Sequence, residues 1–485
     1  MNNILSKETL KLKDATREVA GMAFLWECLP LATSVGRELL LNRSFMTEAP
    51  QIEAELSNLQ SIITAVGKDA NTKNTAQKIA VHLGHVTDVR GSLSRLESGM
   101  TLTDVDFFEI KSFALLAQEI RSLANELQLP FILLPNLLRA ITLLDPEGKR
   151  IPHFYIYNAY SPRLTELRAQ LELLINNKAS EDAVEEFRFT VQEEEDRVRE
   201  SLSEQLAPHV APLRSALQEV ARLDIYLAQA SQSVALGLVR PQILPKGTPG
   251  AFRGLFSPDL QSSLASQGKQ YQPVDISLTE SPTLITGANM SGKSVLLRSV
   301  ALAQTLTQFG FFVPAREAQV EPMDGVAVCM GDTQDAHAGL SSYAAEMLGV
   351  NRIAQAVLSG KRLLVLIDEL ARTTNPIEGA AIVQGVLDFL AEHSVCALVT
   401  SHYAVHTPCR KLRIKGFTGS REMVKSIRPE QLNSYIDYSL EETREDRVPH
   451  EALLIAEIMG VTPALLQKIK PYVEADYTGR KERID

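Results

Sequence analysis

The second half of the sequence predicts an α/β domain with a doubly wound, mostly parallel sheet, preceded by an all-α region. After residue 282, short apolar runs typical of buried strands alternate with amphipathic helical segments. Before residue 236, apolar residues instead recur at helical spacing. One such stripe is formed by Ile52, Leu56, Leu59, Ile62, Ile63 and Val66.

Composition sets the general class of the protein. The chain has 485 residues and 45% hydrophobic content, which is enough for sizeable cores. No apolar run reaches the about 20 residues that a membrane span needs, and the first residues do not resemble a secretory signal. The four cysteines are scattered without metal-type spacing. We therefore expect no membrane association and a cytoplasmic protein with reduced thiols.

The charge of the chain limits how it can bind nucleic acid. The net charge is −10, and no dense cluster of lysine and arginine occurs. Because nucleic-acid-binding domains are usually basic, any such contact here would depend on a local patch.

Local signals divide the helical part. A helix is expected near Thr103, where Asp106 completes a capping box. Ser161 and Pro162 are a good helix start, and a seam of leucines follows in a long helical hairpin. The acidic run at 193–196 is interpreted as a solvated helix face. We predict a helical core at 1–160, a lever hairpin at 161–236, a proline-rich junction that starts the α/β domain at 237–282, the α/β domain at 283–448, a C-terminal helical segment at 449–473 and a flexible tail at 474–485.

A phosphate-binding motif connects the first strand of the α/β domain to its first helix. It fits G-x-x-x-x-G-K-[ST] and consists of Gly287, Ala288, Asn289, Met290, Ser291, Gly292, Lys293 and Ser294. Its glycines let backbone N–H groups point at phosphate oxygens. Lys293 supplies a positive charge near the β and γ phosphates, and Ser294 offers a hydroxyl to Mg²⁺. The motif predicts a nucleotide site.

Two later strands end in polar side chains that suit nucleotide hydrolysis. The apolar run 363–367 is followed by Asp368 and Glu369. Asp368 can hold Mg²⁺, and Glu369 can polarise the attacking water as general base. A second apolar run, 395–400, leads to His402, which can sense the γ-phosphate or orient the water. The alternative for His402 is a structural hydrogen bond to nearby backbone.

The polar, glycine-punctuated segment 331–347 leads into a helix. A hydroxyl and the N–H groups at that helix start could bind phosphate, either within this chain or across a dimer. The alternative is an ordinary helix capped by Ser341 or Ser342.

The residues of this half resemble the MutS family. The loop Thr286–Ser294 resembles the family's T-G-x-N-M-x-G-K-S, and its Asn289-Met290 pair is the specific part. Further matches are Phe312–Ala315, Asp335, Gly339, Ser341, Tyr343, Glu346, Met347, Asp368, Glu369, Arg372, Thr374, Gly379, Thr400–Tyr403 and the segment 449–468.

This resemblance implies an ATP hydrolase that uses ATP and Mg²⁺ and works as a homodimer, or with a different partner subunit. Ser341 of one subunit would complete the site that Lys293, Asp368, Glu369 and His402 form in the other. The segment 449–473 would pack at the dimer contact. Tyr271 is the candidate for stacking on adenine.

The resemblance extends more loosely to earlier residues. Leu144–Gly148 and Ser161–Arg168 are similar to the junction between core and lever in the MutS2-type branch. The family's mismatch-reading and connector domains would need a long segment before the helical core, so we expect this sequence to lack both domains. The segment between the two lever helices is short, so we also expect no clamp domain. Leu340 and Val274 also differ from the residues often found there.

The sequence leaves two alternatives for the macromolecule on which the ATPase acts, which we call its client: DNA or another protein. The family resemblance implies a dimeric ATP-driven switch in DNA mismatch repair or related DNA metabolism. The alternative is a protein client, as in the ATPase component of a reactivase for a cobalamin-dependent lysine aminomutase. The acidic lever and the missing clamp favour this alternative.

Overall fold

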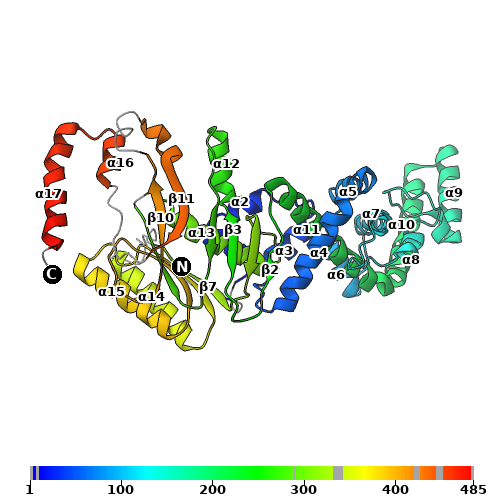
Figure 1. Cartoon of the computed structure of the whole chain (residues 1–485). Coiled ribbons are helices and arrows are strands. Elements are labelled where there is room, and N and C mark those ends of the chain that lie inside the picture. Colours follow the sequence, from blue (N-terminus) through cyan, green and yellow to red (C-terminus); the bar gives the residue numbers. More distant parts are fainter. Residues whose placement is uncertain are drawn as a thin grey trace. The chain divides into compact units, whose positions relative to one another are not determined.

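The computed structural model describes residues 4–6, 10–288, 290–330, 342–419, 427–443 and 452–481 (Figure 1). The chain forms two compact units, which are described separately. The first consists of Met1–Cys28, Arg43–Leu56 and Ser233–Asp485, and the second of Leu29–Asn42 and Ser57–Gln232. Among the described residues, no helix combines the length and the apolar character needed to cross a membrane.

A seven-stranded sheet, counted over the described residues, is the centre of the first unit. Its order is β1-β7-β8-β9-β5-β10-β11. The inner pairs from β7 to β10 are parallel, whereas β1 and β11 pair antiparallel at the edges. The strands are β1 (Ile4–Ser6), β5 (Pro282–Thr286), β7 (Gly325–Met330), β8 (Leu363–Asp368), β9 (Cys396–Thr400), β10 (Arg410–Phe417) and β11 (Ile436–Glu442).

Helices cover both faces of this sheet. Val365 and Ile367 of β8 share one core cluster with α14 (Ser342–Leu358) and α15 (Pro376–Glu392). Leu364 and Leu366 are fully buried but lie outside that cluster. Because side chains alternate along a strand, they face the opposite side. The helix α13 (Lys293–Gln308) contacts β7 and β8 and covers that side.

A four-stranded sheet takes three of its strands from the segment that the sequence predicts as a junction. Its order is β2-β6-β3-β4, and its strands are β2 (Gln242–Ile243), β3 (Ala251–Leu255), β4 (Val274–Ser277) and β6 (Glu317–Val320). The helix α12 (Pro258–Ser266) connects β3 to β4, and α1 (Leu12–Glu18) and α2 (Met22–Glu27) belong to the same unit. The predicted junction 237–282 thus contains three strands of this sheet and the helix α12.

The chain ends in two helices of the first unit, α16 (Ala452–Ile458) and α17 (Pro463–Lys481). The helix α17 continues through residues 474–481, where the sequence analysis places a flexible tail. Proline stands inside this helix, at Pro471.

The second unit is helical. Its helices, two of which also contribute residues to the first unit, are α3 (Ser34–Leu41), α4 (Ala49–Gly67), α5 (Ala70–Leu83), α6 (Arg90–Glu97), α7 (Asp104–Glu126), α8 (Leu138–Leu144), α9 (Pro162–Asn176), α10 (Glu181–Leu206) and α11 (Val210–Leu236). The predicted starts are present. Thr103 and Asp106 form the capping box of α7, and Ser161 caps α9 with Pro162 in its first turn.

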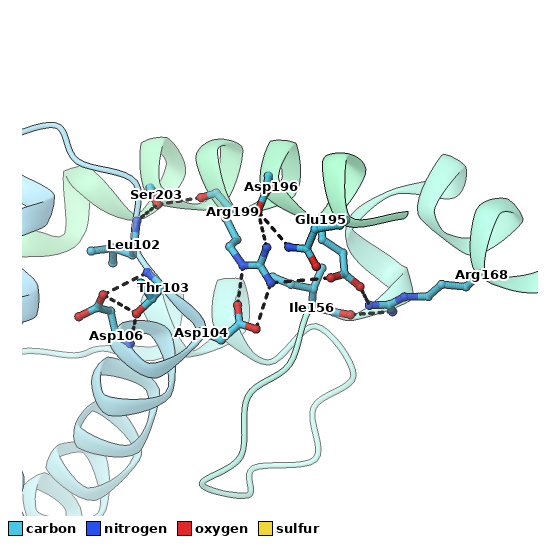
Figure 2. Close-up of polar contacts among 11 residues, drawn as sticks. Leu102, Thr103, Asp104, Asp106, Ile156, Arg168, Glu195, Asp196, Arg199 and Ser203 are labelled. Carbon is cyan, nitrogen blue, oxygen red and sulfur yellow. Dashed lines mark hydrogen bonds and ion pairs between the residues drawn. The ribbon is translucent and has the colours of Figure 1, made fainter. Parts of the chain in front are cut away.

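The acidic run of α10 is a solvated face only in part: Glu193 and Asp196 are exposed as predicted, whereas Glu194 and Glu195 take part in packing. Glu194 is buried and accepts a hydrogen bond from Ser161 Oγ at 2.8 Å. Figure 2 shows the neighbouring residues: Arg168 donates to Glu195 Oε1 at 2.6 Å, and Arg199 donates to Asp104 Oδ1 at 2.7 Å. These contacts bind α10 to α9 and to the first turn of α7. The sequence pattern cannot show this, because the partners are distant in sequence.

Candidate nucleotide-binding site

The predicted phosphate loop lies between a buried strand and a long helix. All of β5 is buried, and α13 starts at Lys293 directly after Gly292. Gly292 has φ 89°, and a Cβ there would meet the Tyr438 ring at 2.9 Å. Glycine is therefore required both by the backbone and by the close approach of the ring. Met290 also has positive φ, at 67°, and is exposed.

Lys293 is held inside the loop that precedes it. Its Nζ donates to Gly287 O at 2.9 Å and to Ala288 O at 2.8 Å, and the residue is only 5% exposed. Burial lowers the pKa of Lys293, while the negative charges of Glu369 and Asp368 act in the opposite direction. The arrangement places a cation where an incoming anion would find few competing waters.

The two serines of the loop, Ser291 and Ser294, differ in burial. Ser291 Oγ is buried and has no hydrogen-bond partner among the described residues. Ser294 is half-buried in the first turn of α13, where its hydroxyl and the helix N-terminus lie together. Asn289 and Ser341 lie outside the described residues.

Asp368 is the last residue of β8, and Glu369 follows it. The strand β9 lies between β8 and β5 and is parallel to both. Asp368 Oδ1 accepts a 2.6 Å hydrogen bond from Thr400 Oγ1, the last residue of β9. The same hydroxyl accepts from the Glu369 amide at 2.7 Å. The carboxylate of Glu369 accepts from Arg372 Nη1 at 2.8 Å. The carboxyl ends of adjacent parallel strands thus bring these groups to the edge where α/β sheets bind ligands.

His402 lies just beyond β9 and is exposed, with its ring 4.0 Å from that of Tyr403 between centroids. Partial desolvation lowers the pKa of His402. The charge of Glu369 raises it, and those of Lys293 and Arg372 lower it further. The Glu369 amide donates to Thr400, two residues before His402, so the ends of β8 and β9 place these two predicted residues at the same edge of the sheet.

A cavity of about 600 Å³ adjoins the phosphate loop. Its lining includes Tyr271, Met290, Gly292, Ser299, Asn433 and Tyr438. The sequence analysis identifies Tyr271 but misses Tyr438, which lies on β11. No local signal points to Tyr438, because β11 reaches the site through partners that are distant in sequence, the strand β10 and Gln272.

Hydrogen bonds from one residue fix the spacing of the two tyrosines. Gln272 Nε2 donates to Asp437 Oδ1 at 2.8 Å, and Gln272 Oε1 accepts from the Tyr438 amide at 3.1 Å. The hydrogen bond from Gln272 is the largest of several contributions that lower the pKa of Asp437 to about 2. Tyr271 OH accepts from the Ser257 amide at 3.2 Å. Two aromatic rings therefore border one cavity next to a cationic loop.

Within the described residues, no group of three or more His, Cys, Asp or Glu side chains has the arrangement of a metal centre. The predicted ligands Asp368 and Ser294 offer oxygen atoms, the donors that Mg²⁺ prefers, and Mg²⁺ is usually held by one or two carboxylates together with waters and substrate phosphates.

Comparison with known proteins agrees with this geometry. Residues 283–435 match the family model described as MutS domain V. The DNA mismatch repair protein MutS of Thermus aquaticus is 31% identical over 270 residues, which are 56% of this chain and 31% of that protein. MutS of Chloroflexus aurantiacus is 29% identical over 255 residues, 50% of this chain and 25% of that protein. Endonuclease MutS2 of Ligilactobacillus salivarius is 29% identical over 235 residues, 47% of this chain and 28% of that protein.

The matched parts of this chain span less than a third of the length of these relatives. The family model covers the strand with the phosphate loop, the acidic pair and His402. The chain therefore contains a region that matches MutS domain V, and about half of its length is similar to MutS and MutS2 proteins.

Proposed function

We propose that this chain is a Mg²⁺-dependent ATP hydrolase that acts as a dimeric, ATP-driven conformational switch in DNA mismatch repair or related DNA metabolism. One observation carries the proposal: the buried Lys293 ammonium, enclosed by the carbonyls of Gly287 and Ala288, and the Asp368 carboxylate, held by Thr400, lie at the carboxyl ends of the neighbouring parallel strands β5, β8 and β9. We interpret the sheet that contains these strands, together with its helices, as a doubly wound P-loop fold.

The residues present fit ATP. The loop 287–292 and the N-terminus of α13 provide N–H groups, and Lys293 provides a positive charge for the triphosphate. The cavity beside the loop is lined by Tyr271 and Tyr438 and suits a flat base. The unpartnered Ser291 hydroxyl at its border is a further donor.

The roles of the acidic residues follow from their contacts. Asp368 is oriented by Thr400 and, with Ser294, would hold Mg²⁺. When bound, Mg²⁺ neutralises charge that develops on the phosphate oxygens. Glu369 would accept a proton from the attacking water. The ion pair of Glu369 with the exposed Arg372 is of the kind that contributes about 1 kcal/mol or less, so breaking it would cost little when the carboxylate takes up this role.

Two such sites would form across a symmetric dimer, with Ser341 acting on the partner's nucleotide. ATP would then favour a closed dimer through contacts that need the γ-phosphate, and hydrolysis would reopen it. The lever hairpin 161–236 would transmit the change, and the segment 449–473 would lie at the dimer contact.

Subunit mixing tests the shared site. Lys293→Ala and Ser341→Ala chains are each expected to be inactive. In a mixed dimer, one of the two sites keeps both residues, so random mixing should recover about a quarter of the wild-type rate. No recovery on mixing would place Ser341 and Lys293 in the same site of one chain.

The relatives favour a DNA client over the aminomutase reactivase, because they are named for DNA mismatch repair or as an endonuclease. A salt titration of DNA binding tests this. Contacts to phosphates release counterions, so affinity for DNA should fall steeply as salt rises. Affinity that is absent, or that does not change with salt, would reject DNA as the client.

A further inference from the structure

The segment after β8 has a backbone that its residues do not favour. Glu369 has φ 50° and Ala371 has φ 60°, although neither is glycine. Left-handed conformations of residues with a Cβ persist only where the surroundings hold them. The surroundings of Ala371, two residues after the proposed general base, therefore need an explanation.

The peptide groups of Ala371 are held from two sides. Its amide donates to Glu346 Oε1 at 2.9 Å, and its carbonyl accepts from Tyr403 OH at 2.9 Å. Glu346 belongs to α14, and Tyr403 follows β9, so the two partners come from different elements. We call these two hydrogen bonds the Ala371 clamp.

The clamp is closely packed, and Glu346 is its half-buried member. Ala371 is fully buried and Tyr403 nearly so. A Cβ on Gly379 of α15 would lie 2.6 Å from Tyr403 Cζ and OH, so glycine is what allows the ring to reach Ala371. Burial raises the pKa of Glu346, and the Ala371 hydrogen bond opposes that change. Buried hydrogen bonds of this kind leave little freedom to the segment that they hold.

We propose that Glu346 and Tyr403 are positioning residues for hydrolysis, which hold Ala371 so that Glu369 keeps the backbone that aims its carboxylate. The inference rests on the proposed ATPase function. It also gives α14, the helix that follows the segment 331–341, a direct contact to the loop of the general base. A small displacement of a catalytic group is costly, since about 1 Å can reduce a rate about 100-fold.

Four variants test the clamp in single-turnover ATP hydrolysis and in binding of a non-hydrolysable ATP analogue. Glu346→Ala and Tyr403→Phe each remove one hydrogen bond and should slow hydrolysis at least about 10-fold, with unchanged analogue affinity. Glu346→Gln keeps an acceptor oxygen and should stay close to wild type. Adding Ala371→Gly to Tyr403→Phe should restore the rate, because glycine adopts positive φ without a clamp.

A matched control separates positioning from general stability. Tyr160 OH donates to Leu143 O at 3.0 Å in the helical unit, so Tyr160→Phe also removes a tyrosine–carbonyl hydrogen bond. It should leave hydrolysis unchanged. Wild-type hydrolysis by Glu346→Ala and Tyr403→Phe would overturn the clamp. The clamp would also be overturned if Glu346→Gln hydrolysed ATP as slowly as Glu346→Ala and if adding Ala371→Gly did not restore the rate of Tyr403→Phe.

Failure of the proposed function gives a different result. A wild-type protein that neither binds nor hydrolyses ATP contradicts the ATPase itself. The clamp can then be tested without nucleotide, by measuring the rate of amide hydrogen exchange at residues 370–372. Faster exchange in Glu346→Ala than in wild type supports the clamp, and equal exchange contradicts it.

Discussion

Thr400 Oγ1 donates a 2.6 Å hydrogen bond to Asp368 Oδ1 and so fixes the carboxylate proposed to hold Mg²⁺. Loss of such a supporting partner typically weakens metal affinity about 10- to 100-fold. Thr400→Val should therefore raise the Mg²⁺ concentration that half-saturates hydrolysis by about 10-fold or more. A magnesium titration of the ATPase rate measures this. Thr400→Ser keeps the hydroxyl and serves as the matched control; an unchanged half-saturation in Thr400→Val would remove Asp368 from the metal site.

Glu369 is expected to act on the attacking water. Glu369→Gln keeps the size and polarity of the side chain but cannot accept the proton, so turnover should fall about 100-fold or more. Nucleotide affinity should persist, since no binding contact is assigned to this carboxylate. Rapid-quench hydrolysis and fluorescent-nucleotide binding measure the two effects. Turnover near the wild-type rate would show that another group is the base.

His402 should give the enzyme an acid limb in its pH profile. Partial desolvation holds its pKa below the usual value of 6.5, so the ring is neutral at pH 7 and becomes charged only at lower pH. If the neutral ring is the active form, kcat/KM should fall as the pH drops below about 6.5. His402→Gln should lose this limb, whereas His393→Gln, at the exposed end of α15, should keep it. A limb centred above 6.5, or one that survives in His402→Gln, would contradict this role.

Tyr438 is expected to bind the base. Stacking on an aromatic ring contributes about 1–3 kcal/mol per base, so Tyr438→Ala should weaken ATP binding about 10-fold or more. Binding of inorganic tripolyphosphate should change little, because it has no base. Tyr438→Phe keeps the ring and should resemble wild type. Competition binding with both ligands gives the comparison, and equal weakening of the two would assign Tyr438 to the phosphates.

The parts of the site that depend on neighbouring residues could be predicted from sequence. The strand, the loop and the helix around Lys293 are contiguous, and the apolar run before Asp368 forms the expected buried strand. The capping box of Thr103 is local in the same way.

The remaining features depend on residues that are distant in sequence. Tyr438 reaches the phosphate loop because β11 pairs with β10 and is bound by Gln272. The Ala371 clamp needs Glu346 of α14 and Tyr403, which follows β9. From the sequence, Glu194 is one of several acidic residues expected on the surface, yet it is buried and accepts a hydrogen bond from Ser161. Periodicity and motifs cannot show such partners, since both describe single segments.

Calorimetric titration of a non-hydrolysable ATP analogue with Mg²⁺ tests the central claim most directly. We expect one binding site per chain in the wild-type protein. Hydrogen bonds to charged groups contribute about 1.5–3 kcal/mol, so Lys293→Ala should bind at least about 10-fold more weakly. If the wild-type protein gives no binding, or if Lys293→Ala binds equally well, the loop after β5 is not a nucleotide site.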